Sequence, residues 1–267
     1  MHSKGFWATI ALGVLTATLL AVGLSGPAAA APGVTAGRIG PGTQLVTAGR
    51  SCTANFVFRD AQHRVFVGYA ASCATRTPAG AAGTCARSLP QGTVVRLADR
   101  GRTLGYGALR YSSFRSLRRA GVTDAASCAA DDFALVEIRG AARRRVSPAV
   151  PYWGGPTGVA DLPAAGATVF GLARPSAAAR TIPRAGQVST VSTSIAAVTT
   201  LLPGTRAERG SGFLDESGRA VGILTSSAAS GENSVVGLAG AIAFARHHGV
   251  PGLRVVSGGA FSGAAVL

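Results

Sequence analysis

Short segments rich in valine, phenylalanine, leucine and threonine recur along most of the chain, and glycine, proline and aspartate separate them. Strands of this length and spacing, without regular alternation with helices, are typical of an all-β sandwich or barrel rather than of βαβ units. The sequence therefore predicts an all-β fold. The predicted strands are residues 53–58, 64–69, 93–97, 103–111, 133–138, 168–172, 187–192, 197–202, 213–214 and 220–225.

Three further segments organise the chain. NFVFRDAQHRVFVGYA, residues 55–70, is the clearest hairpin, because a polar turn separates two valine- and phenylalanine-rich runs. AGAIAFARHHG, residues 239–249, predicts the only helix, since histidines and a glycine suit a helix C-terminus. RGAARRRVSPAVPYWGGPTG, residues 139–158, reads as a linker, so we expect two β units of similar size with a late helix.

Residues 1–30 are predicted to be a secretory signal peptide. Lys4 precedes an apolar run from Phe6 to Leu24, and GPAAAAP offers small residues for cleavage after Ala30. The alternative is an uncleaved membrane anchor, because the run approaches the ~20 residues that a bilayer needs. No second apolar stretch of that length follows, so we expect a secreted protein with no membrane association after cleavage.

The cysteines number four, Cys52, Cys73, Cys85 and Cys128, and in a secreted chain an even number argues for two disulfides. Their spacing leaves all three pairings open, and no C-x-x-C motif is present. The histidines do not cluster with them either, so we expect no metal and no cofactor.

The net charge of +15 rests on arginine, because Lys4 is the only lysine. Arginines gather at Arg115, Arg118 and Arg119, and again over residues 143–145. A solvated basic surface is the simpler interpretation, and binding to an acidic polymer is the alternative. Aromatic residues are few and are not interleaved with the arginines, so we expect no specific nucleic-acid binding.

Four segments follow one another along the chain: SCTANFVFRD with VFVGYAASCA, DDFALVEI, SPAVPYWGGPTG and PGTRAERGSGFLDESGRAVGIL. In this order they resemble the landmarks of secreted bacterial serine peptidases of the chymotrypsin-like class. SCTANFVFRD with VFVGYAASCA resembles the strands leading to the A-A-H-C motif, and DDFALVEI resembles N-D-F-A-L-V. SPAVPYWGGPTG resembles the inter-barrel segment, and PGTRAERGSGFLDESGRAVGIL resembles the segment around G-D-S-G. The resemblance implies a chymotrypsin-like double β-barrel with a short C-terminal helix: a first barrel over 31–140, a linker over 141–162, and a second barrel with the helix over 163–267.

The residues at the catalytic positions of that family differ here. The match places Ser72 where the histidine belongs and Arg209 where the nucleophilic serine belongs, whereas the aspartate is kept as Asp132. Ala207 and Glu208 replace the glycine and aspartate before the nucleophile, which alters the oxyanion loop. Such a triad needs a hydroxyl, a base and a carboxylate, and a serine is no base near neutral pH.

Ser211 is the alternative nucleophile if the match is shifted by two residues. That shift breaks the downstream match of GFLD and GRAVGIL, so Ser211 reads as the second serine that the family often has at this place. The resemblance also implies the disulfide pairs Cys52–Cys73 and Cys85–Cys128.

Loss of the imidazole leaves Asp132 in need of a partner, because an unpaired buried carboxylate is costly. We hypothesise that the Arg209 guanidinium and the Ser72 hydroxyl fill the vacated space and satisfy Asp132. The sequence thus predicts a monomeric, inactive trypsin-like protease homologue that binds a peptide or protein. The alternatives are an active endopeptidase that uses Ser211 and a basic cell-surface or polyanion-binding protein.

Overall fold

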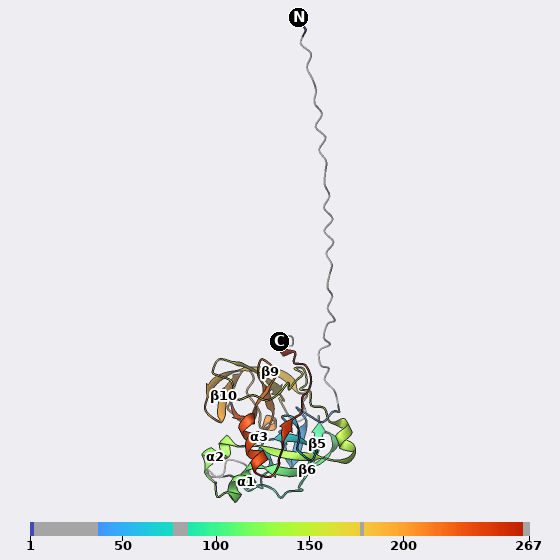
Figure 1. Ribbon diagram of the computed structural model, residues 1–267, viewed down its shortest axis with the longest axis vertical. Helices are drawn as coiled ribbons and strands as arrows, with labels where there is room; N and C mark the ends of the chain where they lie inside the picture. Colours follow the sequence, from blue (N-terminus) through green and yellow to red (C-terminus); the bar gives the residue numbers. More distant parts are fainter. Residues whose placement is uncertain (3–36, 77–84, 177–178, 264–267) are drawn as a thin grey trace. The chain divides into compact units, whose positions relative to one another are not determined.

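The computed structural model describes residues 1–2, 37–76, 85–176 and 179–263 (Figure 1). The predicted signal peptide, apart from its first two residues, lies outside these ranges. Among the described residues, no helix is long and apolar enough to span a membrane.

The first β unit is a sheet of eight strands in the order β14-β3-β4-β7-β6-β5-β1-β2, with antiparallel neighbours throughout. Strand β14 comes from the C-terminal end of the chain, and its pairing with β3 ties that end to the first unit. The strands are β1 (Gln44–Thr47), β2 (Arg50–Thr53), β3 (Val57–Arg59), β4 (Val65–Tyr69), β5 (Val94–Asp99), β6 (Arg102–Ser112), β7 (Ala134–Ile138) and β14 (Arg254–Val255).

The second β unit is a closed barrel in the order β10-β13-β12-β11-β8-β9. Closure pairs every strand on both sides, so no strand edge remains exposed. The strands are β8 (Thr168–Ala173), β9 (Ile182–Val191), β10 (Ile195–Thr200), β11 (Gly212–Leu214), β12 (Ala220–Ser227) and β13 (Glu232–Gly237).

The predicted hairpin is confirmed as β3 and β4, which pair antiparallel. Asp60 closes its turn, because one carboxylate oxygen accepts the backbone N–H of Gln62 at 3.0 Å and that of Arg64 at 2.9 Å. Gly68 in β4 leaves no room for a side chain, since a Cβ there would lie 2.3 Å from the Asn55 Oδ1 atom.

The single strand predicted over residues 53–58 is wrong. Strand β2 ends at Thr53 and β3 begins only at Val57. Between them the Asn55 side chain accepts the backbone N–H of Phe56 at 2.7 Å. A local bond of this kind competes with the ladder and interrupts the strand.

The late helix is confirmed as α3 (Leu238–His247), and two short helices were not predicted, α1 (Ser113–Arg119) and α2 (Ala125–Ala130). One hydrophobic cluster includes Phe58 of β3, Ile223 of β12 and Ile242 of α3, so it packs the two β units and α3 together. Helix α3 packs against β12 and β13 of the second unit and against α1.

Two disulfides join Cys52 to Cys73 and Cys85 to Cys128, as the resemblance implied. The first holds the end of β2 against the turn η1 (Ala71–Ala74), and the second ties α2 to the chain that precedes β5. Each bridge contributes about 2–4 kcal/mol of stability.

The linker segment over residues 141–162 holds most of the turn η2 (Gly140–Arg145) and no strand. Trp153 within it is fully buried, and its indole N–H donates to the carbonyl of Gly171 in β8 at 2.7 Å. The linker is therefore fastened to the second unit by a buried aromatic anchor.

Candidate functional site

Ser72 and Asp132 meet on the first β unit. Ser72 lies in η1, directly after β4, and Asp132 lies two residues before β7, which pairs with β4. The Ser72 backbone N–H donates to Asp132 Oδ1 and the Ser72 hydroxyl donates to Asp132 Oδ2, both at 2.7 Å. Both side chains are buried, and the Ser72 hydroxyl is the side-chain group that bonds this carboxylate.

Arg209 belongs to a loop of the second unit that is bonded to the first. It directly follows the turn η3 (Arg206–Glu208). The Thr53 backbone N–H donates to the Arg209 carbonyl at 2.9 Å, and the Thr53 hydroxyl donates to the Ala207 carbonyl at 2.7 Å. The next residue, Gly210, has a φ of +95°, and a Cβ there would lie 2.9 Å from the Ala70 nitrogen.

The structure thus gathers Ser72, Asp132 and Arg209, which lie far apart in the sequence. Burial raises the pKa of Asp132, whereas its bonds to Ser72 and the nearby Arg209 charge lower it. Half of our hypothesis about Asp132 is wrong: among the described residues no hydrogen bond or ion pair joins the Arg209 guanidinium to this carboxylate. The Ser72 bonds satisfy Asp132, and Arg209 acts on it only through its charge.

In the loop predicted to be the altered oxyanion loop, the backbone N–H groups of Glu208 and Arg209 form hydrogen bonds within the loop itself. Within η3 the N–H of Glu208 donates to the Thr205 carbonyl at 3.0 Å, and that of Arg209 donates to the Arg206 carbonyl at 3.4 Å. An oxyanion site needs free N–H groups aimed at the developing charge. The Arg209 N–H instead serves the turn.

The Glu208 carboxylate anchors this loop through contacts with two other residues of the second unit. It is almost fully buried, and its Oε2 atom forms an ion pair with Arg184 of β9 at 2.6 Å. Its other oxygen accepts the backbone N–H of Arg174 at 2.6 Å. A buried carboxylate fixed at both oxygens sets the position of η3 and of Arg209 after it.

No base is hydrogen-bonded to Ser211 among the described residues. Ser211 is 1 % exposed, and its hydroxyl has no hydrogen-bond partner among the described residues. All four histidines are described and exposed, and none bonds Ser211 or Asp132. Activation of a serine needs an adjacent base, so this geometry does not favour Ser211 as a nucleophile.

Asp131, the neighbour of Asp132, has two buried carboxylate oxygens without a hydrogen-bond partner among the described residues. Burial, together with the charge of Asp132, raises the pKa of Asp131 to about 8. It lines a cavity of about 400 Å³ with Leu117 of α1, Val191 at the end of β9 and Phe244 of α3. This cavity adjoins the candidate site and is lined by both β units. The remaining described residues form no group of three or more side chains suited to a metal ion.

The raised pKa of Asp131 gives the protein a pH-dependent stability. A carboxyl whose folded pKa exceeds its unfolded value of about 4 binds its proton more tightly when folded. The contribution of Asp131 to the free energy of unfolding should therefore be largest below about pH 4 and fall by a few kcal/mol as the pH rises toward 8. We expect Asp131→Asn to flatten this curve and to stabilise the protein at pH 8.

Urea unfolding at pH 5 and pH 8 measures both curves, with Asp161→Asn as the control, because Asp161 lines the same cavity but is exposed. A curve unchanged by Asp131→Asn would contradict a buried, unpartnered carboxylate.

The two β units, one of them a closed barrel, and the few helices define the chymotrypsin-like double β-barrel fold, as the sequence predicted. Solved structures with this fold are similar to the chain. A Glu endopeptidase has a TM-score of 0.55 at 15 % identity, with 82 % of this chain and 94 % of that one covered. The corresponding values for a Nocardiopsis protease are 0.50 and 13 %, with 81 % and 98 % covered.

A glutamic-acid-specific serine protease also matches, with a TM-score of 0.50 at 15 % identity and coverage of 81 % of this chain and 99 % of that one. Likeness at this level of identity shows the fold. No protein-family model and no curated protein matches the sequence.

Sequence reasoning missed three charged residues of the site: Asp131, Arg174 and Arg184. Asp131 carried a signal, because it stands beside Asp132 in DDF and the two carboxyls share one buried region. Arg174 and Arg184 carried none, since each is a single arginine beside or within a strand and only the fold brings it to Glu208.

Proposed function

We propose that the chain is a secreted protein with a serine-protease fold that binds peptide segments and does not cleave them. One observation carries the proposal: Ser72, and not a base, is the side chain bonded to Asp132. A hydroxyl that donates to a carboxylate cannot take a proton from an attacking nucleophile at neutral pH. The retained disulfides and the buried core are consistent with selection for the fold without the chemistry.

Two further observations support the loss of chemistry, and a third supports binding. Arg209, a cation without nucleophilic character, stands at the end of η3, and its N–H is engaged in the turn. Ser211 is buried, and its hydroxyl has no hydrogen-bond partner among the described residues. The cavity beside Asp131 offers a ligand a place between the two β units. The disulfides suit an oxidising compartment, which favours secretion.

Fluorescein-labelled casein tests binding and cleavage in one experiment. We expect fluorescence polarisation to rise at once when the mature protein is added, because binding slows tumbling, and then to stay constant for hours. A steady fall of polarisation would indicate hydrolysis. If Ser211→Ala abolished that fall, the alternative of an active endopeptidase using Ser211 would replace the proposal.

A further inference from the structure

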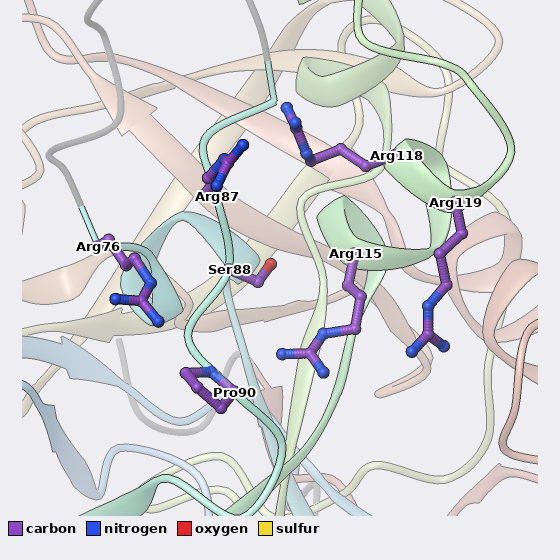
Figure 2. Close-up of a pocket in the computed structure, with 7 residues that line it drawn as sticks. All are labelled: Arg76, Arg87, Ser88, Pro90, Arg115, Arg118 and Arg119. Carbon is purple, nitrogen blue, oxygen red and sulfur yellow. The ribbon is translucent and has the colours of Figure 1, made fainter.

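A second cavity, of about 500 Å³, is lined by five arginines and lies apart from the candidate site. Two of them, Arg76 and Arg87, come from the chain between η1 and β5, and three come from α1. Ser88 and Pro90 complete the lining, and neither Ser72, Asp132 nor Arg209 belongs to it. Figure 2 shows the arginines of the two segments on either side of Ser88. The α1 arginines are Arg115, Arg118 and Arg119.

Among the described residues, no acidic side chain forms an ion pair with these arginines. The described residues that line the cavity include no aspartate or glutamate. The sequence TPAGAAGT of residues 77–84 adds no charge between Arg76 and Arg87. Burial, and then the charge of Arg119, lowers the pKa of Arg115. Like charges held this close are unfavourable unless an anion joins them.

The fold holds part of the cluster in place and leaves the rest free to bind. The Arg115 guanidinium donates to the Leu89 carbonyl, and that of Arg118 donates to the Cys85 carbonyl at 3.4 Å. The Cys85–Cys128 disulfide and the buried Phe114 of α1 fix these segments. By contrast, the guanidiniums of Arg76, Arg87 and Arg119 are exposed and have no hydrogen bond within the described part of the chain.

The chemistry of the cavity selects the anion. Guanidinium groups bind phosphate oxygens in a bidentate manner, so several of them around one cavity fit closely spaced phosphates. Condensed phosphates share bridging oxygens and can present several groups to the cavity at once, whereas a sugar separates the phosphates of a nucleic acid. Among the described residues that line the cavity, none is aromatic, so none can stack on a base. We propose that this arginine cavity binds a condensed phosphate chain, with tripolyphosphate as its simplest probe.

Isothermal titration calorimetry of the mature protein with tripolyphosphate tests the proposal. The pocket variant is Arg76→Gln/Arg119→Gln, and the matched control, Arg143→Gln/Arg144→Gln, removes the same charge from the turn η2. We expect the pocket variant to bind at least about 10-fold more weakly and the control to bind like the natural protein. Binding should also weaken between about 50 and 200 mM salt. Thermal unfolding checks that both variants fold, and Arg87→Gln replaces the pocket variant if it does not.

Three results would overturn the proposal: no binding of tripolyphosphate, equal losses in the two double variants, or tighter binding of a thymidine oligonucleotide that depends on the same arginines. The last result would assign the cavity to nucleic acid. None of these results bears on cleavage of casein, so the proposed function and this inference fail separately.

Discussion

The triple variant Ser72→His/Ala207→Gly/Arg209→Ser should hydrolyse casein, whereas the natural protein should not. The backbone N–H of residue 72 would keep its bond to Asp132 Oδ1. The new imidazole would donate to Asp132 Oδ2, which now accepts the Ser72 hydroxyl. The carboxylate would then orient a base toward the new hydroxyl in the loop of the second unit. Glu208 stays unchanged, because its ion pair with Arg184 already holds that loop.

The size of the effect follows from what each group contributes. A positioned general base is worth about 10²–10⁴ in rate. Ser72→His alone adds a base without a nucleophile, and Arg209→Ser alone adds a hydroxyl without a base. Both single variants should stay at the level of the natural protein, with the triple variant about 10²–10⁴-fold above them. A folded triple variant no faster than Arg209→Ser would contradict the grouping of these positions in one catalytic site.

Replacing Arg184 by methionine should lower the free energy of unfolding by about 3–5 kcal/mol, because it leaves the buried Glu208 carboxylate without its cation. Urea unfolding measures the loss. An exposed pair offers the control: Arg219 bonds Asp215 at 2.8 Å but its side chain is half exposed, so Arg219→Met should cost at most about 1 kcal/mol.

A rescue separates lost charge from lost packing. In Arg184→Met/Glu208→Gln the second change removes the uncompensated charge, while the amide oxygen can still accept the Arg174 N–H. The double variant should recover about 1 kcal/mol or more relative to Arg184→Met. A double variant as unstable as the single one would indicate that packing, and not the ion pair, holds η3 in place.

Much of the fold could be predicted, because strand patterns depend on local residue choice. The hairpin of β3 and β4 and the helix α3 carry their signals within about 16 residues. Strand β13 begins with Glu232 and Asn233, and β14 is two residues long, so neither has an apolar pattern and only pairing with distant strands defines them. The helices α1 and α2 were missed for a similar reason, because each is too short to show a helical pattern of apolar residues in the sequence.

The candidate site could be predicted in part for the same reason. Motif spacing located Ser72, Asp132 and Arg209, but it could not state whether Arg209 reaches the carboxylate, since that depends on how η3 is held. Arg184 sets that position from a strand with no motif. The sequence showed the three α1 arginines of the arginine cavity as a cluster. It gave no sign of the other two, Arg76 and Arg87, because these are separated in the sequence from the cluster and from each other.

Intact mass spectrometry after treatment with a fluorophosphonate tests the central claim, that no activated serine remains, most directly. This reagent phosphonylates a serine only where a neighbouring base has activated it, so the triple variant serves as the positive control. The natural mature protein should keep its unmodified mass while the triple variant gains one phosphonyl group. Phosphonylation of the natural protein, mapped to Ser211 or Ser72, would contradict the claim.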